Sequence, residues 1–377
     1  MKKSLLILLF TCWALFFAAF RPVMPFAAET AAFPDGTPVT GGRILMGTIG
    51  EPSNLIPYMA SDSASGEITG LLYVAPLKYD KDLNVVPWAA ASYEVLEGGR
   101  LLRFVLRDDI RWEDGVPLTA DDVEFTYKLM IDPKTPTAYS GDFLAIESFK
   151  KTGRLSFEVR YAKPFARSLM TWMGAILPKH VLEGQDIMTT PVARKPIGAG
   201  PYRLAKWDAG SMLTLTASDT YFEGRPNLDE VVYRIIPDPS TMFLELKAGK
   251  LDMMSLSPQQ YLRQTQGPQW ERDWRKYRYL SFSYTFLGFN LEHPFFKDVR
   301  VRRAISMAID RQSLIDGVLL GQGVPTVGPY KPGTWAYNDK LTPVRQDVDE
   351  ARRLLDEAGW KKDKDGLLER DGKPFLF

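Results

Sequence analysis

Hydrophobic residues recur along the chain with two different periods. Leu102, Phe104 and Leu106 occupy every second position, and the same alternation returns at 155–161. This period predicts half-buried strands. Further strands are expected at 43–49, 202–207, 212–216 and 231–236. The second and third of these should form a hairpin, because Asp-Ala-Gly at 208–210 is a turn sequence.

Helical segments are marked by capping residues. Thr119 followed by Asp122 predicts a helix that ends at Asp132, because the residue before Pro133 avoids the helical region. Asp347 and Glu350 form a second capping pair. Other helices are expected at 65–73, 300–309 and 311–318, and one from a Ser240 cap to Gly249. Strands interleaved with helices predict an α/β fold.

Two apolar stretches lie near the end of the chain. The aromatic run Tyr279–Asn290 predicts a long strand, and Lys373–Phe377 resembles the start of a strand without a continuation. A compact domain rarely ends on an apolar strand with an open edge. We therefore expect the chain to be a fragment of a longer protein.

The N-terminus has the three parts of a secretory signal. Lys2 and Lys3 precede an apolar run from Leu5 to Phe20, and Ala27-Ala28 supply small residues for cleavage. We expect a signal peptide at 1–28 and a periplasmic protein; an uncleaved membrane anchor is the alternative.

Composition excludes several classes of protein. The chain has 377 residues, enough for two or three domains, with 47 basic and 46 acidic side chains. This balance gives no field that would attract nucleic acid. The one cysteine, Cys12, lies within the expected signal and excludes a disulfide framework.

Catalytic and metal-binding motifs are scarce. The two histidines, His180 and His293, have no metal-binding spacing, so we expect no metal and no cofactor. Ser148 and Lys151 match an S-x-x-K motif, in which the lysine would lie one helical turn from the serine and activate it. The companion S-D-N and K-T-G motifs are absent. A periplasmic serine hydrolase using Ser148 and Lys151 is therefore a remote alternative.

Five segments carry a more specific signal. They are GEPSNLIP at 50–57, LRDDIRWEDGVPLTADDV at 106–123, GAGPY at 198–202, LKAGKLD at 246–252 and FKDVRVRRAISMAID at 296–310. In this order they resemble the family 5 extracellular solute-binding proteins, the dipeptide- and oligopeptide-binding components of bacterial ABC importers.

The resemblance implies a fold like that of type II periplasmic binding proteins, with two lobes, a hinge and an extra domain. Domain I would comprise 29–73 and 197–285, and domain II 74–196. Residues 286–377 would be only the N-terminal portion of domain III. The strand at 279–290 would cross the hinge.

The same resemblance implies a binding protein and not an enzyme. It would be a monomer that captures di- or oligopeptides outside the cytoplasmic membrane and delivers them to a permease with cytoplasmic ATPases. Other family members bind nickel complexes, haem, glutathione or oligosaccharides, so a non-peptide solute is the close alternative. A non-functional fragment is a third possibility.

Ligand-binding residues follow from the family pattern. Ser61, Asp62, Ser63 and Ala64 match a loop that faces the ligand through its backbone, and the alternative is a plain surface loop. Tyr139 matches a tyrosine against the ligand; packing between domains is its alternative. Gly288 stands where one member has an acidic contact, so that contact is missing. The aspartate expected for a peptide amino terminus lies beyond Phe377.

Overall fold

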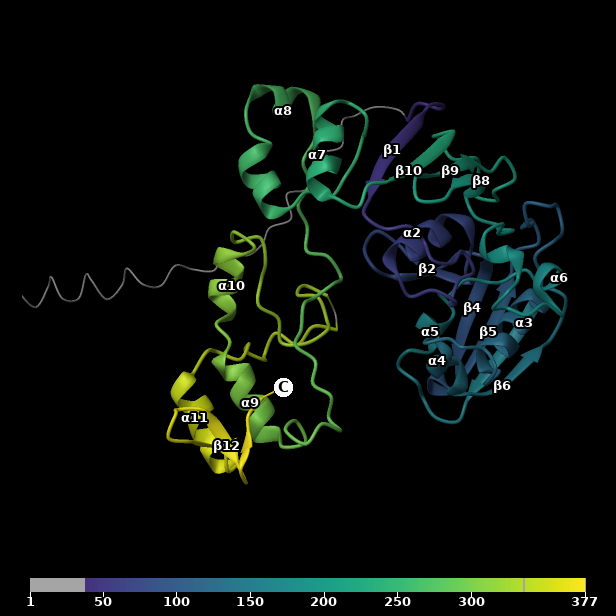
Figure 1. Ribbon diagram of the computed structural model, residues 1–377. Coiled ribbons are helices and arrows are strands. Elements are labelled where there is room, and N and C mark those ends of the chain that lie inside the picture. The colour runs from purple at the N-terminus through teal and green to yellow at the C-terminus, as the bar shows by residue number, and fades with distance from the viewer. Residues whose placement is uncertain (1–37, 335, 377) are drawn as a thin grey trace, which may run out of the picture. The chain divides into compact units, whose positions relative to one another are not determined.

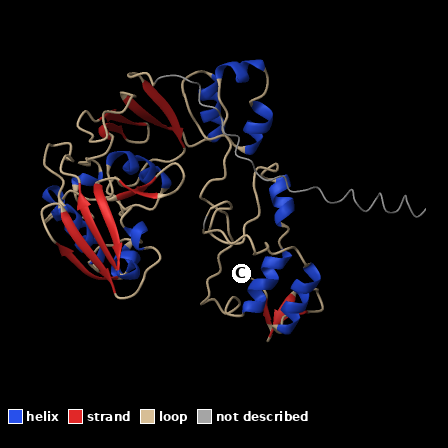
Figure 2. Cartoon of the chain, turned by 180° about the vertical axis from the view of Figure 1, so that it is seen from behind, coloured by secondary structure: helices blue, strands red, loops and turns tan. Residues whose placement is uncertain are grey.

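The structure is a computed structural model that describes residues 38–334 and 336–376. The expected signal at 1–28 therefore lies outside the described residues. The chain divides into two compact units on either side of Ser255 and Leu256. Figure 1 labels the elements, and Figure 2 shows that the larger sheets belong to the first unit while the second consists mostly of helices and loops.

One sheet of the first unit has the order β1-β10-β9-β8. Its strands are β1 (Arg43–Thr48), β8 (Tyr202–Asp208), β9 (Met212–Ala217) and β10 (Glu230–Ile235). β1 runs parallel to β10, and the other pairs are antiparallel. The predicted hairpin is confirmed, with Gly210 at φ 69° in the turn.

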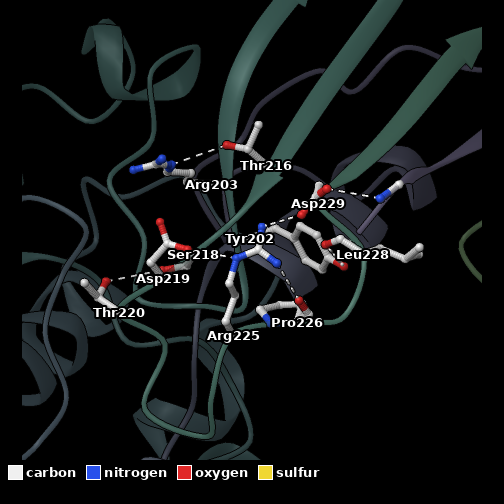
Figure 3. Close-up of polar contacts among 11 residues, drawn as sticks. Tyr202, Arg203, Thr216, Ser218, Asp219, Thr220, Arg225, Pro226, Leu228 and Asp229 are labelled. Atoms are coloured by element: carbon white, nitrogen blue, oxygen red, sulfur yellow. Dashed lines mark hydrogen bonds and ion pairs between the residues drawn. The ribbon is translucent and has the colours of Figure 1, made fainter. Parts of the chain in front are cut away.

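Asp229 fixes the start of β1 against this sheet (Figure 3). Its Oδ2 accepts a hydrogen bond from the Gly42 amide at 3.0 Å, and its Oδ1 accepts one from Arg225 at 2.6 Å. Arg225 also donates to Asp219 at 2.8 Å. The loop before β10 is thereby tied to a strand almost two hundred positions earlier in sequence.

The second sheet is wholly antiparallel, in the order β4-β5-β7-β6. Its strands are β4 (Ala90–Leu96), β5 (Leu101–Leu106), β6 (Ile146–Lys151) and β7 (Ser156–Tyr161). The predicted alternation in β5 is confirmed, because Leu102, Phe104 and Leu106 are all buried. A small hairpin pairs β2 (Leu77–Tyr79) with β3 (Val85–Pro87).

Helices and single turns complete the first unit. They are α2 (Ser63–Leu72), α3 (Ala120–Ile131), α4 (Ser140–Leu144), α5 (Ser168–Thr171), α6 (Lys179–Leu182), α7 (Pro239–Lys247) and 3-10 turns at Glu97–Gly99 and Pro191–Ala193. The capping box of α3 is confirmed: Thr119 caps the helix and its amide donates to Asp122 at 2.8 Å. The cap of α7 is Asp238, so the prediction of Ser240 is wrong.

The two sheets share one hydrophobic core, which runs from α2 through both sheets. The chain passes between the sheets after Leu72 and returns through Gly198 and Gly200. The Gly200 amide donates to the Leu72 carbonyl at 2.8 Å. Gly198 exchanges two bonds with Glu113, from the Gly198 amide to the Glu113 carboxylate at 2.9 Å and from the Glu113 amide to the Gly198 carbonyl at 2.8 Å. These bonds lock the crossing.

The second unit contains a π-helical turn at Gln260–Gln264, α8 (Pro268–Asp273), α9 (Val299–Ala308), α10 (Arg311–Gly317) and α11 (Val348–Glu357). A three-stranded sheet follows, with β11 (Lys361–Lys362), β12 (Leu368–Arg370) and β13 (Lys373–Pro374). The predicted cap of α11 at Asp347 is confirmed. A small core of the second unit is formed by the buried side chains of Phe296, Val301, Ala358 and Trp360.

Two sequence predictions near the C-terminus differ from the structure. The run Tyr279–Asn290 forms no strand, because no described segment supplies a neighbouring ladder of hydrogen bonds. Lys373–Pro374 is a strand, but it pairs with β12, so its edge on that side is not open. Within the described residues, no helix has the length and apolar character needed to cross a membrane.

Candidate functional site

The start of α2 is organised by Asp62. Its Oδ1 accepts a hydrogen bond from the Ser65 amide at 2.8 Å, and its Oδ2 accepts bonds from the hydroxyls of Ser65 and Ser53 at 2.8 and 2.6 Å. Burial alone would raise the pKa of Asp62, but these hydrogen bonds outweigh burial and lower it. The Asp62 carboxylate therefore fixes the loop before α2 by accepting three hydrogen bonds from Ser53 and Ser65.

Tyr58 connects this loop to two other parts of the first unit. Its backbone has φ 73°, a region that a residue with a bulky side chain seldom adopts. Its hydroxyl donates to the Ala175 carbonyl at 2.8 Å, and its own carbonyl accepts a bond from the Thr137 hydroxyl at 2.8 Å. A side chain at Gly174 would begin 2.3 Å from the Tyr58 hydroxyl. Burial raises the pKa of that hydroxyl.

Tyr139 lies against Tyr58. Their ring centroids are 6.1 Å apart with an interplanar angle of 65°, an edge-on contact. The Tyr139 amide donates to the Thr137 hydroxyl at 3.1 Å, while 46% of the Tyr139 side chain is exposed. Because Tyr58 precedes Ser61 by three positions, two predicted parts of the site, Tyr139 and the Ser61 segment, meet at the same loop.

The predicted segment 61–64 is only partly a loop. Ser61 and Asp62 precede α2, but Ser63 and Ala64 form its first turn, so the prediction of a continuous loop is wrong for these two. The amides of Ser63 and Ala64 have no intrahelical acceptor, since a helix leaves its first N–H groups free. Gly288 is exposed and belongs to the second unit.

Sequence reasoning missed Tyr58 and Thr137. Each follows a proline, Pro57 or Pro136, and residues next to a proline often lie in turns or loops. It also missed a groove of about 650 Å³ over β1, β9 and β10. Charged residues line part of this groove: Arg43, Glu230, Arg234 and Lys250. Arg43 lies far from the other three residues in sequence, and the four come together only when the strands pair.

The serine hydrolase hypothesis is contradicted by local geometry. Ser148 and Lys151 lie on β6, and residues three apart on a strand point to opposite faces. Lys151 is instead paired with Asp121. His180 contacts the Asp114 carboxylate at 2.8 Å on the surface. Across residues 38–334 and 336–376, no group of three His, Cys, Asp or Glu side chains is placed to hold a metal ion.

Comparison with known proteins places this geometry in a family. Residues 84–377 match the model of the bacterial extracellular solute-binding proteins, family 5 Middle. The chain belongs to the family 5 bacterial extracellular solute-binding proteins. The fold class expected from sequence, α/β and like the type II periplasmic binding proteins, is therefore confirmed.

Several known proteins resemble the chain over most of its length. The oligopeptide-binding protein AppA of Bacillus subtilis is 33% identical over 351 residues, which cover 91% of this chain and 64% of AppA. The dipeptide-binding protein of Escherichia coli is 28% identical over 304 residues, 74% of this chain and 56% of that protein. The chain thus spans less than two thirds of the length of these relatives.

Solved structures agree with the family assignment. AppA of Bacillus subtilis in complex with a nonapeptide superimposes with a TM-score of 0.80 and 32% identity, covering 90% of this chain and 68% of AppA. NikZ of Campylobacter jejuni in complex with Ni(L-His) gives a TM-score of 0.77 and 28% identity, covering 88% of this chain and 66% of NikZ. Proteins with this fold therefore include binders of chemically different solutes.

Proposed function

We propose that the chain is the solute-binding component of a bacterial ABC importer and captures di- or oligopeptides outside the cytoplasmic membrane. The similarity to AppA in complex with a nonapeptide is the observation that carries this proposal. Delivery to a permease with cytoplasmic ATPases, export through a signal at 1–28 and the division into domains I (29–73, 197–285), II (74–196) and III (from 286) belong to the same proposal. The function needs no catalytic residue.

The loop around Tyr58 offers the chemistry for holding an extended peptide. The amides of Ser63 and Ala64 can donate to peptide carbonyls, and the exposed face of Tyr139 can pack against a side chain. Main-chain hydrogen bonds give affinity without reading sequence. A solute that contacts a closed form more than an open one shifts the population toward closure.

The second candidate is a non-peptide solute, and the NikZ complex favours a nickel chelate among these. The two candidates differ in chemistry: a peptide presents a repeating backbone, whereas a histidine chelate of nickel presents one compact charged group. A binding site for the first should tolerate changes of side chain, and a site for the second should not.

Isothermal titration calorimetry on the purified chain tests the proposal. Solutions of a dipeptide, a tetrapeptide, a nonapeptide and Ni(L-His) are titrated in separate runs. We expect heat with at least one peptide and similar affinity when its side chains are changed. Binding of Ni(L-His) with no heat from any peptide would select the second candidate, and no heat from any solute would contradict both for this chain. Labelling of Ser148 by a fluorophosphonate would contradict a non-catalytic role.

A further inference from the structure

Glu51 lies between the end of β1 and the loop that leads to the candidate site. Its carboxylate accepts hydrogen bonds from the Trp207 indole at 2.7 Å and from the Gly210 amide at 3.1 Å. It also forms an ion pair with Arg194 at 3.5 Å. Burial would raise the pKa of Glu51, but these three partners outweigh burial and lower it, so the group is ionised at neutral pH.

Arg194 joins this cluster to a third segment of the chain. Its guanidinium carbon lies 3.8 Å from the centroid of the Trp207 ring, a cation–π contact. Arg194 directly follows a 3-10 turn, and the carbonyl of Ala193 in that turn accepts a hydrogen bond from the Leu55 amide at 3.0 Å. The Leu55 side chain is fully buried. The segment that begins at Glu51 is therefore held at two points, first by a carboxylate and then by its backbone.

Between these two points the chain contacts the first turn of α2. The amides of Ser53 and Asn54 donate to the Ser65 hydroxyl at 3.0 and 3.3 Å. The Ser53 hydroxyl donates to the Asp62 carboxylate, the cap of α2, at 2.6 Å. Because Ser53 is only two positions from Glu51, a displacement of Glu51 would also move the residues that cap the helix.

We infer that Glu51, held by Arg194 and Trp207, is a positioning residue for solute binding; this inference rests on the proposed function. Glu51 itself need not touch the solute. It keeps the start of α2 in place, so that the amides of Ser63 and Ala64 stay aligned for an acceptor on the solute. Groups that are aligned before binding lose less conformational entropy when the solute binds, and affinity rises accordingly.

Hydrogen–deuterium exchange with mass spectrometry tests the positioning step without a solute. Glu51→Gln keeps the size of the side chain but loses its charge and one of its two acceptor oxygens. Amides in the segment 53–65 should exchange about tenfold faster than in the wild type, while those of β5 exchange as before. Glu97→Gln is the matched control, because Glu97 also pairs with an arginine, Arg160 at 2.7 Å, and lies in the turn between β4 and β5. It should leave exchange at 53–65 unchanged.

Calorimetric titration tests the consequence for binding. The titrant is the dipeptide, tetrapeptide, nonapeptide or Ni(L-His), whichever binds the wild type most tightly. Glu51→Gln should bind it about tenfold more weakly, and Glu97→Gln should bind it like the wild type. Trp207→Phe keeps a ring beneath Arg194 but removes the indole donor, so its loss of affinity should be smaller.

The outcomes separate this inference from the proposed function. No heat from the wild type with any of the four solutes contradicts the proposed function and this inference with it. When the wild type binds, unchanged exchange at 53–65 or unchanged affinity in Glu51→Gln overturns the inference alone. Equal acceleration of exchange in β5 would show a general loss of stability, and it would overturn the positioning role as well.

Discussion

Replacement of Gly198 by alanine should strongly destabilise the first unit. An added Cβ would begin 2.0 Å from the Leu72 carbonyl oxygen and 2.9 Å from its carbon. These are backbone atoms, which cannot swing away as the end of a side chain can. The chain must shift at the crossing where Gly198 and Glu113 exchange two hydrogen bonds.

The size of the effect follows from these contacts. Forcing a methyl group into a packed interior costs about 1–3 kcal/mol. Loss of two hydrogen bonds adds about 1 kcal/mol each. The free energy of unfolding should therefore fall by about 3–5 kcal/mol. With a urea m-value of about 3 kcal/mol per molar, the midpoint should drop by more than about 1 M.

Urea unfolding followed by tryptophan fluorescence measures this change, since Trp112 and Trp172 are buried in the first unit. Gly66→Ala is the matched control. Gly66 is exposed in α2 and has nothing within 4 Å of an added Cβ. Alanine there should raise the free energy of unfolding by up to about 1 kcal/mol, because it favours the helix. A Gly198→Ala midpoint equal to that of the wild type would refute the steric argument.

Three further predictions concern single side chains. Burial raises the pKa of Glu113, so the folded state binds its proton more tightly than the unfolded state. As pH rises above 4.5, the free energy of unfolding of the wild type should therefore fall relative to that of Glu113→Gln. Parallel plots of unfolding free energy against pH for the two proteins would contradict this. Asp122→Ala should lower the free energy of unfolding by about 2–4 kcal/mol in urea titrations, because two partly buried amides, those of Thr119 and Lys179, lose their acceptor. Tyr139→Ala should weaken solute binding in calorimetry about tenfold with an unchanged thermal midpoint, whereas Tyr79→Ala, at another exposed tyrosine, should bind normally.

Local patterns made much of the fold predictable. The capping box at Thr119 and Asp122, the hairpin around Gly210 and the alternation in β5 depend on residues within a few positions of one another. The wrong N-cap predicted for α7 also has a local cause. Asp238 and Ser240 are both favourable N-cap residues, and Asp238 is the cap because its Oδ1 accepts a hydrogen bond from the Thr241 amide at 2.7 Å.

Long-range contacts were not predictable in this way. Nothing near Tyr279 in sequence reveals whether a partner strand exists, so the apolar run indicated a strand that the described residues do not form. For the candidate site, the resemblance pointed to Ser61 and Tyr139. It did not point to Tyr58, whose role depends on a carbonyl at Ala175, over a hundred positions away.

The locked crossing at Leu72, Gly198 and Gly200 has a consequence for how the first unit opens. Neither sheet can detach while these amides remain bonded to acceptors on the other side of the crossing. The protons on Gly198 and Gly200 should therefore exchange with deuterated solvent only when the entire unit unravels. Any conformational change that accompanies solute binding must keep both of these amide hydrogen bonds.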